Sequence, residues 1–280
     1  MHFAVSMFPT DRAIPPAELA VAVEERGFES LWFPEHSHIP TSRTSPWPGG
    51  PELPDMYRRT LDQYVALTAA ATVTSRIGLG SGVTLVAQRD PIWLAKQVAS
   101  VDHLSGGRML FGIGYGWNRE EMEHHGVDYR SRRDLVREKV LAMKALWTAD
   151  EASFRGEHVS FAPSWSWPKP VQRPHPPVII GGGPGPRLYA AVAEYGDGWM
   201  PIAGRNPIED HIARLRRAVA DAGRDPDQVS VGVFSAPLDP ARLEALAATG
   251  VERAVFGLPA EPAGVVLAAL DRLAAFVAAL

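Results

Sequence analysis

Short apolar runs alternate with amphipathic stretches along the whole chain. The apolar runs are typical of buried strands, and most are followed by a stretch with helical periodicity. The predicted strands are Phe3–Phe8, Ser30–Pro34, Ile77–Val83, Met109–Gly114, Val178–Gly182, Gly198–Ile202, Val229–Ser235 and Arg253–Leu258. The predicted helices are 15–27, Leu61–Val73, Ile92–Leu104, Arg132–Trp147, Pro186–Tyr195, Pro207–Ala222, Pro240–Thr249 and Ala263–Ala279. This alternation predicts an α/β protein, a (β/α)8 TIM barrel in which residues 1–280 form a single domain, because an open doubly wound sheet usually has fewer strands.

Two connections are longer than a barrel requires. One runs from His36 to Tyr57 and the other from Ala149 to Pro177, and both contain tryptophan and several prolines. Long loops in compact domains are often lids or binding loops. The second connection predicts a small β-hairpin inserted before the fifth strand, with strands Ala152–Arg155 and Glu157–Phe161.

Composition narrows the classes of protein. The chain has 280 residues, a net charge of −4 and no cysteine. Its lysines and arginines are scattered, which argues against a nucleic-acid partner. The lack of cysteine excludes a disulfide framework, a cysteine nucleophile and a thiolate metal site. The start of the sequence does not resemble a signal peptide, and no apolar run reaches membrane-spanning length, so we expect a cytoplasmic protein with no membrane partner.

Alternating glycines end the fourth predicted strand. Gly112, Gly114 and Gly116 lie at alternate positions, and Asn118 follows them. Because side chains alternate faces along a strand, these glycines leave one face bare, where a flat or phosphorylated ligand could lie against the backbone. We therefore expect a ligand at this strand end.

Glu35 and His36 come directly after the second predicted strand. Side chains at the carboxyl ends of barrel strands usually form the active site. An imidazole there can exchange a proton near neutral pH, and the adjacent carboxylate can tune it. The alternative is a histidine that only caps the loop.

Small residues also end the third predicted strand, at Gly80, Ser81 and Gly82 before Val83. They could let a planar ring pack against the main chain, or they could form a β-bulge, and the spacing favours neither. Ser81 is not a hydrolase nucleophile, because the elbow motif needs glycine where Leu79 stands.

A third glycine-rich segment, Gly181, Gly182 and Gly183, lies between the fifth strand and a helix that Pro186 opens. Backbone N–H groups at a helix N-terminus bind anions well, so we expect a phosphate there. Arg205, after the sixth strand, could pair with that phosphate. A plain tight turn and an ordinary loop arginine are the alternatives.

Metal and nucleotide motifs are missing from the sequence. The run from Glu123 to His125 lacks the spacing that places two imidazoles on one helical face, and we predict no metal site. Neither a Walker A loop nor a Rossmann glycine fingerprint occurs.

Five ordered motifs together resemble the bacterial luciferase-like monooxygenase superfamily. They are Leu31–His36, Arg89–Pro91 with Ala95 and Lys96, Ser100–Arg108, Gly112–Asn118, and Gly181–Gly183 with Tyr195–Trp199. The sequence is most similar to the branch of oxidoreductases that use the deazaflavin coenzyme F420. This resemblance implies an enzyme that transfers a hydride to or from a small organic substrate, and a homodimer.

The resemblance also implies roles for individual residues. The deazaflavin ring would lie in the barrel mouth, with Glu35 orienting it and His36 transferring a proton. A non-prolyl cis peptide between Gly82 and Val83 would form its backstop. The remaining positions that match cofactor-binding regions are Ser81, Gly114, Asn118, Gly181, Gly182, Gly183 and Arg205.

One position departs from the family pattern. Sugar-phosphate dehydrogenases of the superfamily have a glutamate where this sequence has Tyr115, so sugar-phosphate oxidation is in doubt. Tyr115 could donate a proton or pack under the ring. An FMN-dependent two-component monooxygenase and a non-catalytic flavin-binding protein of the same fold are the alternative functions. Trp47, Trp165 and Trp167 suggest an apolar or aromatic substrate, or pack within the lids.

Overall fold

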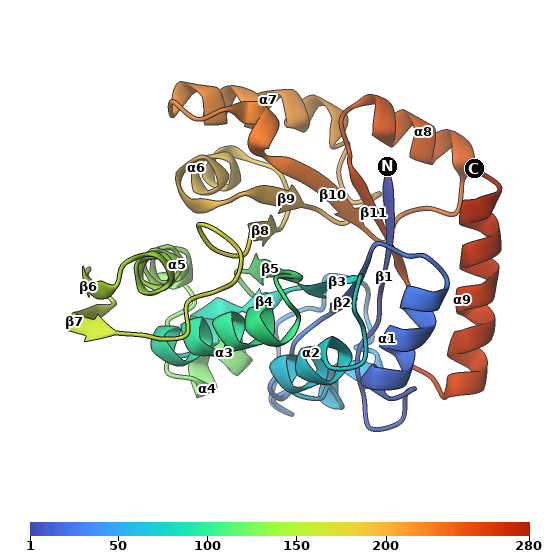
Figure 1. Cartoon of the computed structure of the whole chain (residues 1–280), viewed down its shortest axis with the longest axis horizontal. Helices are drawn as coiled ribbons and strands as arrows, with labels where there is room; N and C mark the ends of the chain where they lie inside the picture. Colours follow the sequence, from blue (N-terminus) through green and yellow to red (C-terminus); the bar gives the residue numbers. More distant parts are fainter.

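A closed barrel of eight parallel strands forms the centre of the computed structural model, which describes residues 1–280 (Figure 1). The barrel strands are β1 (His2–Ser6), β2 (Ser30–Phe33), β3 (Gly78–Ser81), β5 (Met109–Gly114), β8 (Val178–Gly181), β9 (Gly198–Met200), β10 (Ser230–Phe234) and β11 (Arg253–Gly257). A two-residue strand, β4 (Thr84–Leu85), continues β3 and pairs with the upper part of β5. Pairing between β3 and β5 closes the barrel, which confirms the predicted fold.

Helices surround the barrel in the predicted order. They are α1 (Pro16–Glu25), α2 (Gln63–Ala71), α3 (Pro91–Leu104), α5 (Arg132–Thr148), α6 (Pro186–Tyr195), α7 (Glu209–Asp221), α8 (Pro240–Ala248) and α9 (Ala263–Ala278). Four shorter segments were not predicted: α4 (Arg119–His124) and the 3-10 turns η1 (Asp55–Arg58), η2 (Val86–Gln88) and η3 (Pro226–Gln228). These are too short to show a clear apolar period.

Capping residues determine where several helices begin. The Asp62 carboxylate accepts hydrogen bonds from two backbone N–H groups in the first turn of α2. Asp90 does the same for one N–H of α3, and proline follows it at the first helical position. Such caps satisfy backbone donors that have no partner inside the helix.

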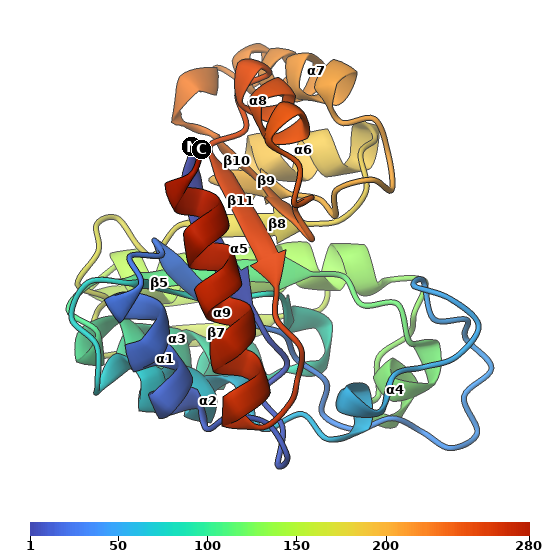
Figure 2. The ribbon, with the colours of Figure 1, turned by 90° about the vertical axis from the view of Figure 1, so that its right-hand side faces the viewer.

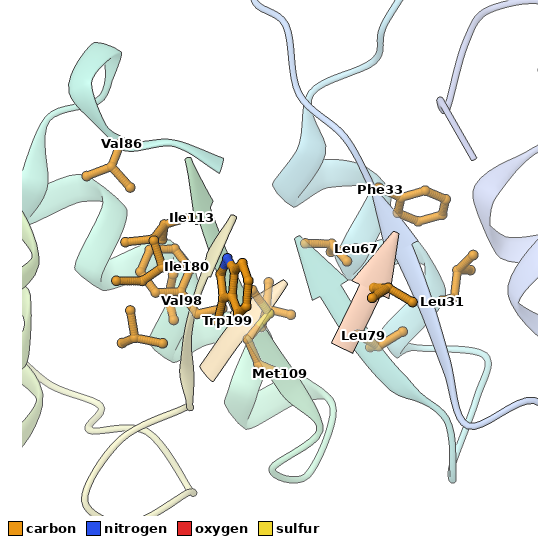
Figure 3. Close-up of a cluster of buried hydrophobic side chains, with 14 of the residues drawn as sticks. Leu31, Phe33, Leu67, Leu79, Val86, Val98, Met109, Ile113, Ile180 and Trp199 are labelled. Atoms are coloured by element: carbon orange, nitrogen blue, oxygen red, sulfur yellow. The ribbon is translucent and has the colours of Figure 1, made fainter. Parts of the chain in front are cut away.

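The main apolar core lies between the strands and the helix layer. Figure 3 shows its centre, where Leu31 and Leu79 from the strands approach Leu67 of α2. Residues of the other strand face point into the barrel instead, as the two-residue period of a strand requires. There Trp32 meets the ring of Phe234 edge-on at a centroid distance of 5.6 Å. The interior below the mouth is therefore filled with side chains.

The predicted hairpin is present as β6 (Glu151–Arg155) and β7 (Ser160–Trp165). Its second strand begins at Ser160, so the predicted start at Glu157 was wrong. The carboxylate of Glu138 accepts hydrogen bonds from the backbone N–H groups of residues 157–159 and holds them in a loop. The hairpin lies outside α5 (Figure 1), and Trp165 is 79% exposed there.

The long connection after β2 lies beside α4 on one side of the barrel (Figure 2). The Glu120 carboxylate of α4 accepts hydrogen bonds from the backbone N–H groups of Thr44 and Ser45, which fixes the two segments together. No helix of the structure combines the length and the apolar character needed to cross a lipid bilayer.

Candidate active site at the barrel mouth

The carboxyl ends of the strands bring the predicted site residues to one end of the barrel. Phe33 pairs with Ser81, Leu85 with Gly114, and Ile113 with Ile180, so the residues that follow these positions meet at the same opening. In (β/α)8 enzymes this end carries the active site. The mouth is therefore the candidate site.

The backbone at Gly82 and Val83, between β3 and β4, forms a β-bulge and contains a cis peptide bond. Gly80 pairs with Leu110 and Thr84 with Ile113, so three residues of β3–β4 face two residues of β5. The peptide bond between Gly82 and Val83 is cis, as the family resemblance implies. The bulge that the sequence allowed is thus present, and packing of a planar ring against these small residues stays a prediction.

Val83 lies between two glycines of neighbouring strands. A Cβ on residue 114 would lie 2.5 Å from Cγ2 of Val83, and one on residue 181 would lie 2.9 Å from Cγ1. Real Cβ atoms do not approach other atoms this closely without a shift in structure. Glycine at both positions therefore makes room for Val83 at the mouth.

Lower in the barrel, side chains fill the face that the alternating glycines were expected to leave bare. A Cβ on Gly80 would collide with the indole of Trp32, and one on Gly112 with the carbonyl of Ser81. The Ser81 hydroxyl donates to the Gly112 carbonyl at 2.8 Å and is fully buried. Ser81 thus joins β3 to β5 below the mouth, and Gly80 and Gly112 serve packing.

His36 is held at the mouth by α4 and by aromatic rings. Its Nδ1 lies 2.7 Å from Oε2 of Glu121, and both residues are buried. The rings of Tyr57 and Trp117 approach the imidazole at centroid distances of 5.1 and 5.8 Å. No hydrogen bond within the chain involves Nε2, which leaves this nitrogen available to a ligand.

The Glu35 carboxylate faces the protein and not the open mouth. Its Oε2 accepts from the backbone N–H of Leu85 at 2.7 Å, and its Oε1 accepts from Nε of Arg89 at 2.6 Å. Burial works against the charge of Arg89, but Glu35 more than offsets it and raises the arginine pKa. Both carboxylate oxygens are thus engaged, and Glu35 supports the segment that follows Val83.

Asn118 presents an unsatisfied donor. It caps α4 through Oδ1, which accepts from the backbone N–H of Glu121. Its Nδ2 is buried and has no hydrogen-bond partner. A buried amide donor without a partner costs free energy, so this atom is suited to a ligand acceptor.

Tyr115 lies on the outer face of β5. Gly114 faces Val83 in the mouth, so the next residue points toward the helices. Its hydroxyl is 2.7 Å from that of Tyr195 in α6, and Arg133 of α5 covers its ring. Burial raises the pKa of the Tyr115 hydroxyl, so it stays protonated. This position gives no support to the predicted role in proton transfer.

The predicted anion region lies across the mouth. Gly182 has φ +138°, and no atom lies within 4 Å of where its Cβ would be. A Cβ on Gly183 would lie 3.6 Å from Nδ2 of Asn206, which brings the glycine loop next to the loop that carries Arg205. No side chain caps the N-terminus of α6.

Arg205 lines a cavity of about 390 Å³ together with Ser235, Arg242 and Glu209. Burial raises the pKa of the Tyr57 hydroxyl, and the positive charge of Arg205 opposes that rise. The charge of Arg205 is thus felt at Tyr57, whose ring packs on His36.

Several residues that support the site were given no role from the sequence, although the acidic pair of Glu120 and Glu121 lies just beyond the glycine-rich strand and Arg89 belongs to one of the family motifs. Arg89 binds the Glu35 carboxylate, and Glu121 binds the His36 ring. Ser37 donates to Glu121, and the ring of Tyr57 packs on His36. The spacing of Asn118 and Glu121 matches a helix capping box, which could have revealed α4. Nothing in the sequence shows that the Glu121 carboxylate turns to His36. The tryptophans of the hairpin connection, Trp165 and Trp167, lie outside the barrel and do not border the mouth.

Known proteins provide independent comparisons. The sequence profile of the family described as luciferase-like monooxygenase matches residues 12–268. An uncharacterized protein of Mycobacterium tuberculosis is 43% identical over 281 residues, which cover 99% of each chain. An F420-dependent glucose-6-phosphate dehydrogenase of Kineococcus radiotolerans is 30% identical over 225 residues, which cover 76% of this chain and 60% of the relative.

A monooxygenase of Streptomyces bottropensis has the same fold, with a TM-score of 0.82 at 19% identity and coverage of 99% of both chains. Its low identity makes it a comparison of fold alone. The family profile spans every barrel strand except β1, including the strand ends that carry Glu35, Val83, Asn118 and Gly182. The chain therefore belongs to the luciferase-like monooxygenase family, and it is an enzyme of that superfamily.

Proposed function

We propose that this protein is an oxidoreductase that uses the deazaflavin coenzyme F420 to transfer a hydride to or from a small organic substrate. The observation that carries the proposal is His36, which is fixed at the barrel mouth through Nδ1 while Nε2 has no partner in the chain. A proton-transfer group placed in this way suits hydride chemistry, which needs a matching proton. The name of the relative from Kineococcus, an F420-dependent dehydrogenase, supports the choice of cofactor.

The residues at the mouth fit such a cofactor. Gly114 and Gly181, which flank Val83, leave room beside the backbone for a planar ring. The unpartnered Nδ2 of Asn118 offers a donor to a ring oxygen or nitrogen. The open backbone at Gly182 and the cationic side chain of Arg205 would hold the anionic tail.

When bound, the deazaflavin supplies hydride transfer and, unlike reduced FMN, does not activate oxygen. The chain supplies binding, orientation and the proton. His36 would exchange that proton at Nε2, and Glu35 would act indirectly by holding Leu85 next to Val83. We do not extend the substrate of the Kineococcus enzyme to this protein, because Tyr115 replaces the acid of sugar-phosphate dehydrogenases and faces outward.

Cofactor titration tests the proposal. Purified protein is titrated separately with F420 and with FMN while ligand fluorescence is followed. We expect F420 to bind at least tenfold more tightly, which corresponds to about 1.4 kcal/mol. Tighter FMN binding, together with substrate-dependent oxygen consumption by reduced FMN, would replace the proposal with the two-component monooxygenase.

A conservative variant tests the predicted contact at Asn118. Asn118→Ser keeps a helix-capping oxygen and removes the amide donor. Because a single hydrogen bond contributes about 0.5–1.5 kcal/mol, F420 affinity should fall roughly 2- to 10-fold while the unfolding free energy changes little. An unchanged affinity would show that this amide does not contact the cofactor.

A further inference from the structure

The environment of His36 constrains its ring more tightly than its place at a strand end requires. Nδ1 lies 2.7 Å from Glu121, and Tyr57 and Trp117 pack at the ring. These contacts come from η1, from α4 and from the segment before it. The imidazole is therefore oriented by elements other than its own loop.

Glu121 is fully buried, and both of its oxygens are engaged. Oε2 meets Nδ1 of His36. Oε1 accepts from the backbone N–H of Ser37 at 3.1 Å and from the Ser37 hydroxyl at 3.3 Å. A carboxylate placed in this way cannot turn without breaking three contacts, so it holds α4 against the loop after β2.

The chemistry of these partners fixes the proton on the ring. An ionised carboxylate only accepts hydrogen bonds, so the neutral imidazole must carry its hydrogen on Nδ1. Nε2 then holds a lone pair and is the basic atom of the ring. In catalytic histidines generally, the bond made by one ring nitrogen determines which nitrogen reacts.

The Ser37 hydroxyl anchors the carboxylate from the solvent side. It lies 2.9 Å from Nδ1 of His38 and 2.8 Å from Nε2 of His125. Burial, with a smaller contribution from His38, lowers the pKa of His125, so this imidazole is neutral at physiological pH. Because the Ser37 hydroxyl gives its one hydrogen to Glu121, its oxygen can only accept from the two imidazoles. Glu121 therefore faces the neutral Ser37 hydroxyl.

We propose that Glu121 is a positioning residue that holds His36 in the Nδ1–H tautomer and so makes Nε2 the atom that exchanges the proton at the barrel mouth. In the transfer, the lone pair of Nε2 forms an N–H bond with a proton from a substrate O–H or N–H group. The substrate bond breaks and leaves its electron pair on the substrate atom, and Glu121 stabilises the resulting imidazolium through Nδ1–H. In the reverse direction the same N–H bond breaks. The catalytic part of this inference rests on the proposed function, whereas the tautomer does not.

Nitrogen NMR of the cofactor-free protein tests the tautomer directly. His36 signals in ¹⁵N-labelled protein are assigned by their loss in His36→Asn, and spectra are recorded at a pH where the ring is neutral. We expect Nδ1 to be protonated and Nε2 to be unprotonated in the parent protein. An Nε2–H tautomer in the parent would overturn the inference, and a variant is needed only to assign the His36 signals.

Glu121→Gln tests whether Glu121 determines the tautomer of His36. Glu123→Gln, at an exposed position on the same helix, is the matched control. A glutamine amide can also donate to Nδ1, so the tautomer should become mixed or reversed in E121Q and stay unchanged in E123Q. With a substrate found by screening, kcat of E121Q should fall roughly 10- to 10⁴-fold, with little change in F420 affinity, as for other carboxylates that support a catalytic imidazole. An unchanged tautomer or an unchanged kcat in E121Q would overturn the inference.

The two proposals can fail separately. If F420 does not bind but the parent shows the Nδ1–H tautomer, the proposed cofactor is wrong and the effect of Glu121 on the ring stands. If F420 binds and the parent shows the Nε2–H tautomer, the proposed function stands and Glu121 only braces the loop.

Discussion

Val83 occupies the space that a side chain on Gly114 would need. A Cβ on residue 114 would lie 2.5 Å from Cγ2 of Val83. Gly114→Ala should therefore lower the unfolding free energy by about 1–3 kcal/mol, the usual cost of overpacking. The urea midpoint measures this effect.

Two variants check that explanation. Gly264→Ala in α9, where a Cβ meets no atom within 4 Å, should be neutral or slightly stabilising. Val83→Ala combined with Gly114→Ala should recover part of the loss, because neighbouring residues are not additive. Strictly additive effects would show that Val83 is not the obstruction.

Replacement of His36 tests the proposed proton transfer. His36→Asn should keep F420 affinity and lower turnover by about 10²–10⁴, the usual contribution of a positioned acid or base. Steady-state kinetics with a verified substrate measures the change, and circular dichroism checks the fold. Turnover at the parental rate in a folded variant would assign the proton to another group.

The pair of Glu35 and Arg89 should contribute to stability as well as to the site. Glu35→Gln removes one partner of a largely buried ion pair, which typically costs about 3–5 kcal/mol. It should also weaken F420 binding, because Leu85 and the cis segment lose their support. A double-mutant cycle with Arg89→Met should show strong coupling in the unfolding free energy. Independent effects of the two substitutions would show that the ion pair does not contribute to stability.

Arg205 should bind the anionic tail of the cofactor. Arg205→Ala should weaken F420 binding by about 1.5–3 kcal/mol, the range for hydrogen bonds to charged groups. Arg217→Ala, which removes an exposed arginine from α7, is the control for net charge. Equal effects of the two variants in titration calorimetry would indicate only long-range attraction.

Lys139 should make stability depend on pH in the alkaline range. Burial lowers its pKa to about 8, and its ammonium donates to the carbonyls of Ala87 and Arg89. Between pH 8 and its unfolded pKa of about 10.4, the unfolded chain binds more protons, so stability rises with pH by on the order of 2–3 kcal/mol. Below pH 8, Lys139 is protonated in both the folded and the unfolded chain, and the folded protein bears the full free-energy cost of burying the ammonium charge.

Lys139→Met isolates this contribution from other groups that titrate near pH 10. Urea denaturation of the parent and the variant at pH 7.5 and pH 10 should show that the parent gains relative stability at the higher pH. A constant difference between the two proteins would show that the lysine is not desolvated.

The barrel could be predicted because its strands are continuous apolar runs, and because proline opens and glycine follows several of its helices. The hairpin register could not, because it depends on Glu138, which is remote in sequence from the residues that it binds. His36 could be found from its place after a strand, whereas the contact with Glu121 joins residues 85 positions apart. The outward direction of Tyr115 follows from strand alternation and could have been predicted from Gly114.

Trp32 gives the barrel a solid floor. Its indole lies against Gly80 and against Phe234, and its Nε1 donates to the Ser30 hydroxyl, which in turn donates to Glu29 near the opposite end. Because these side chains close the barrel below the mouth, a ligand can reach its interior only past the carboxyl ends of the strands.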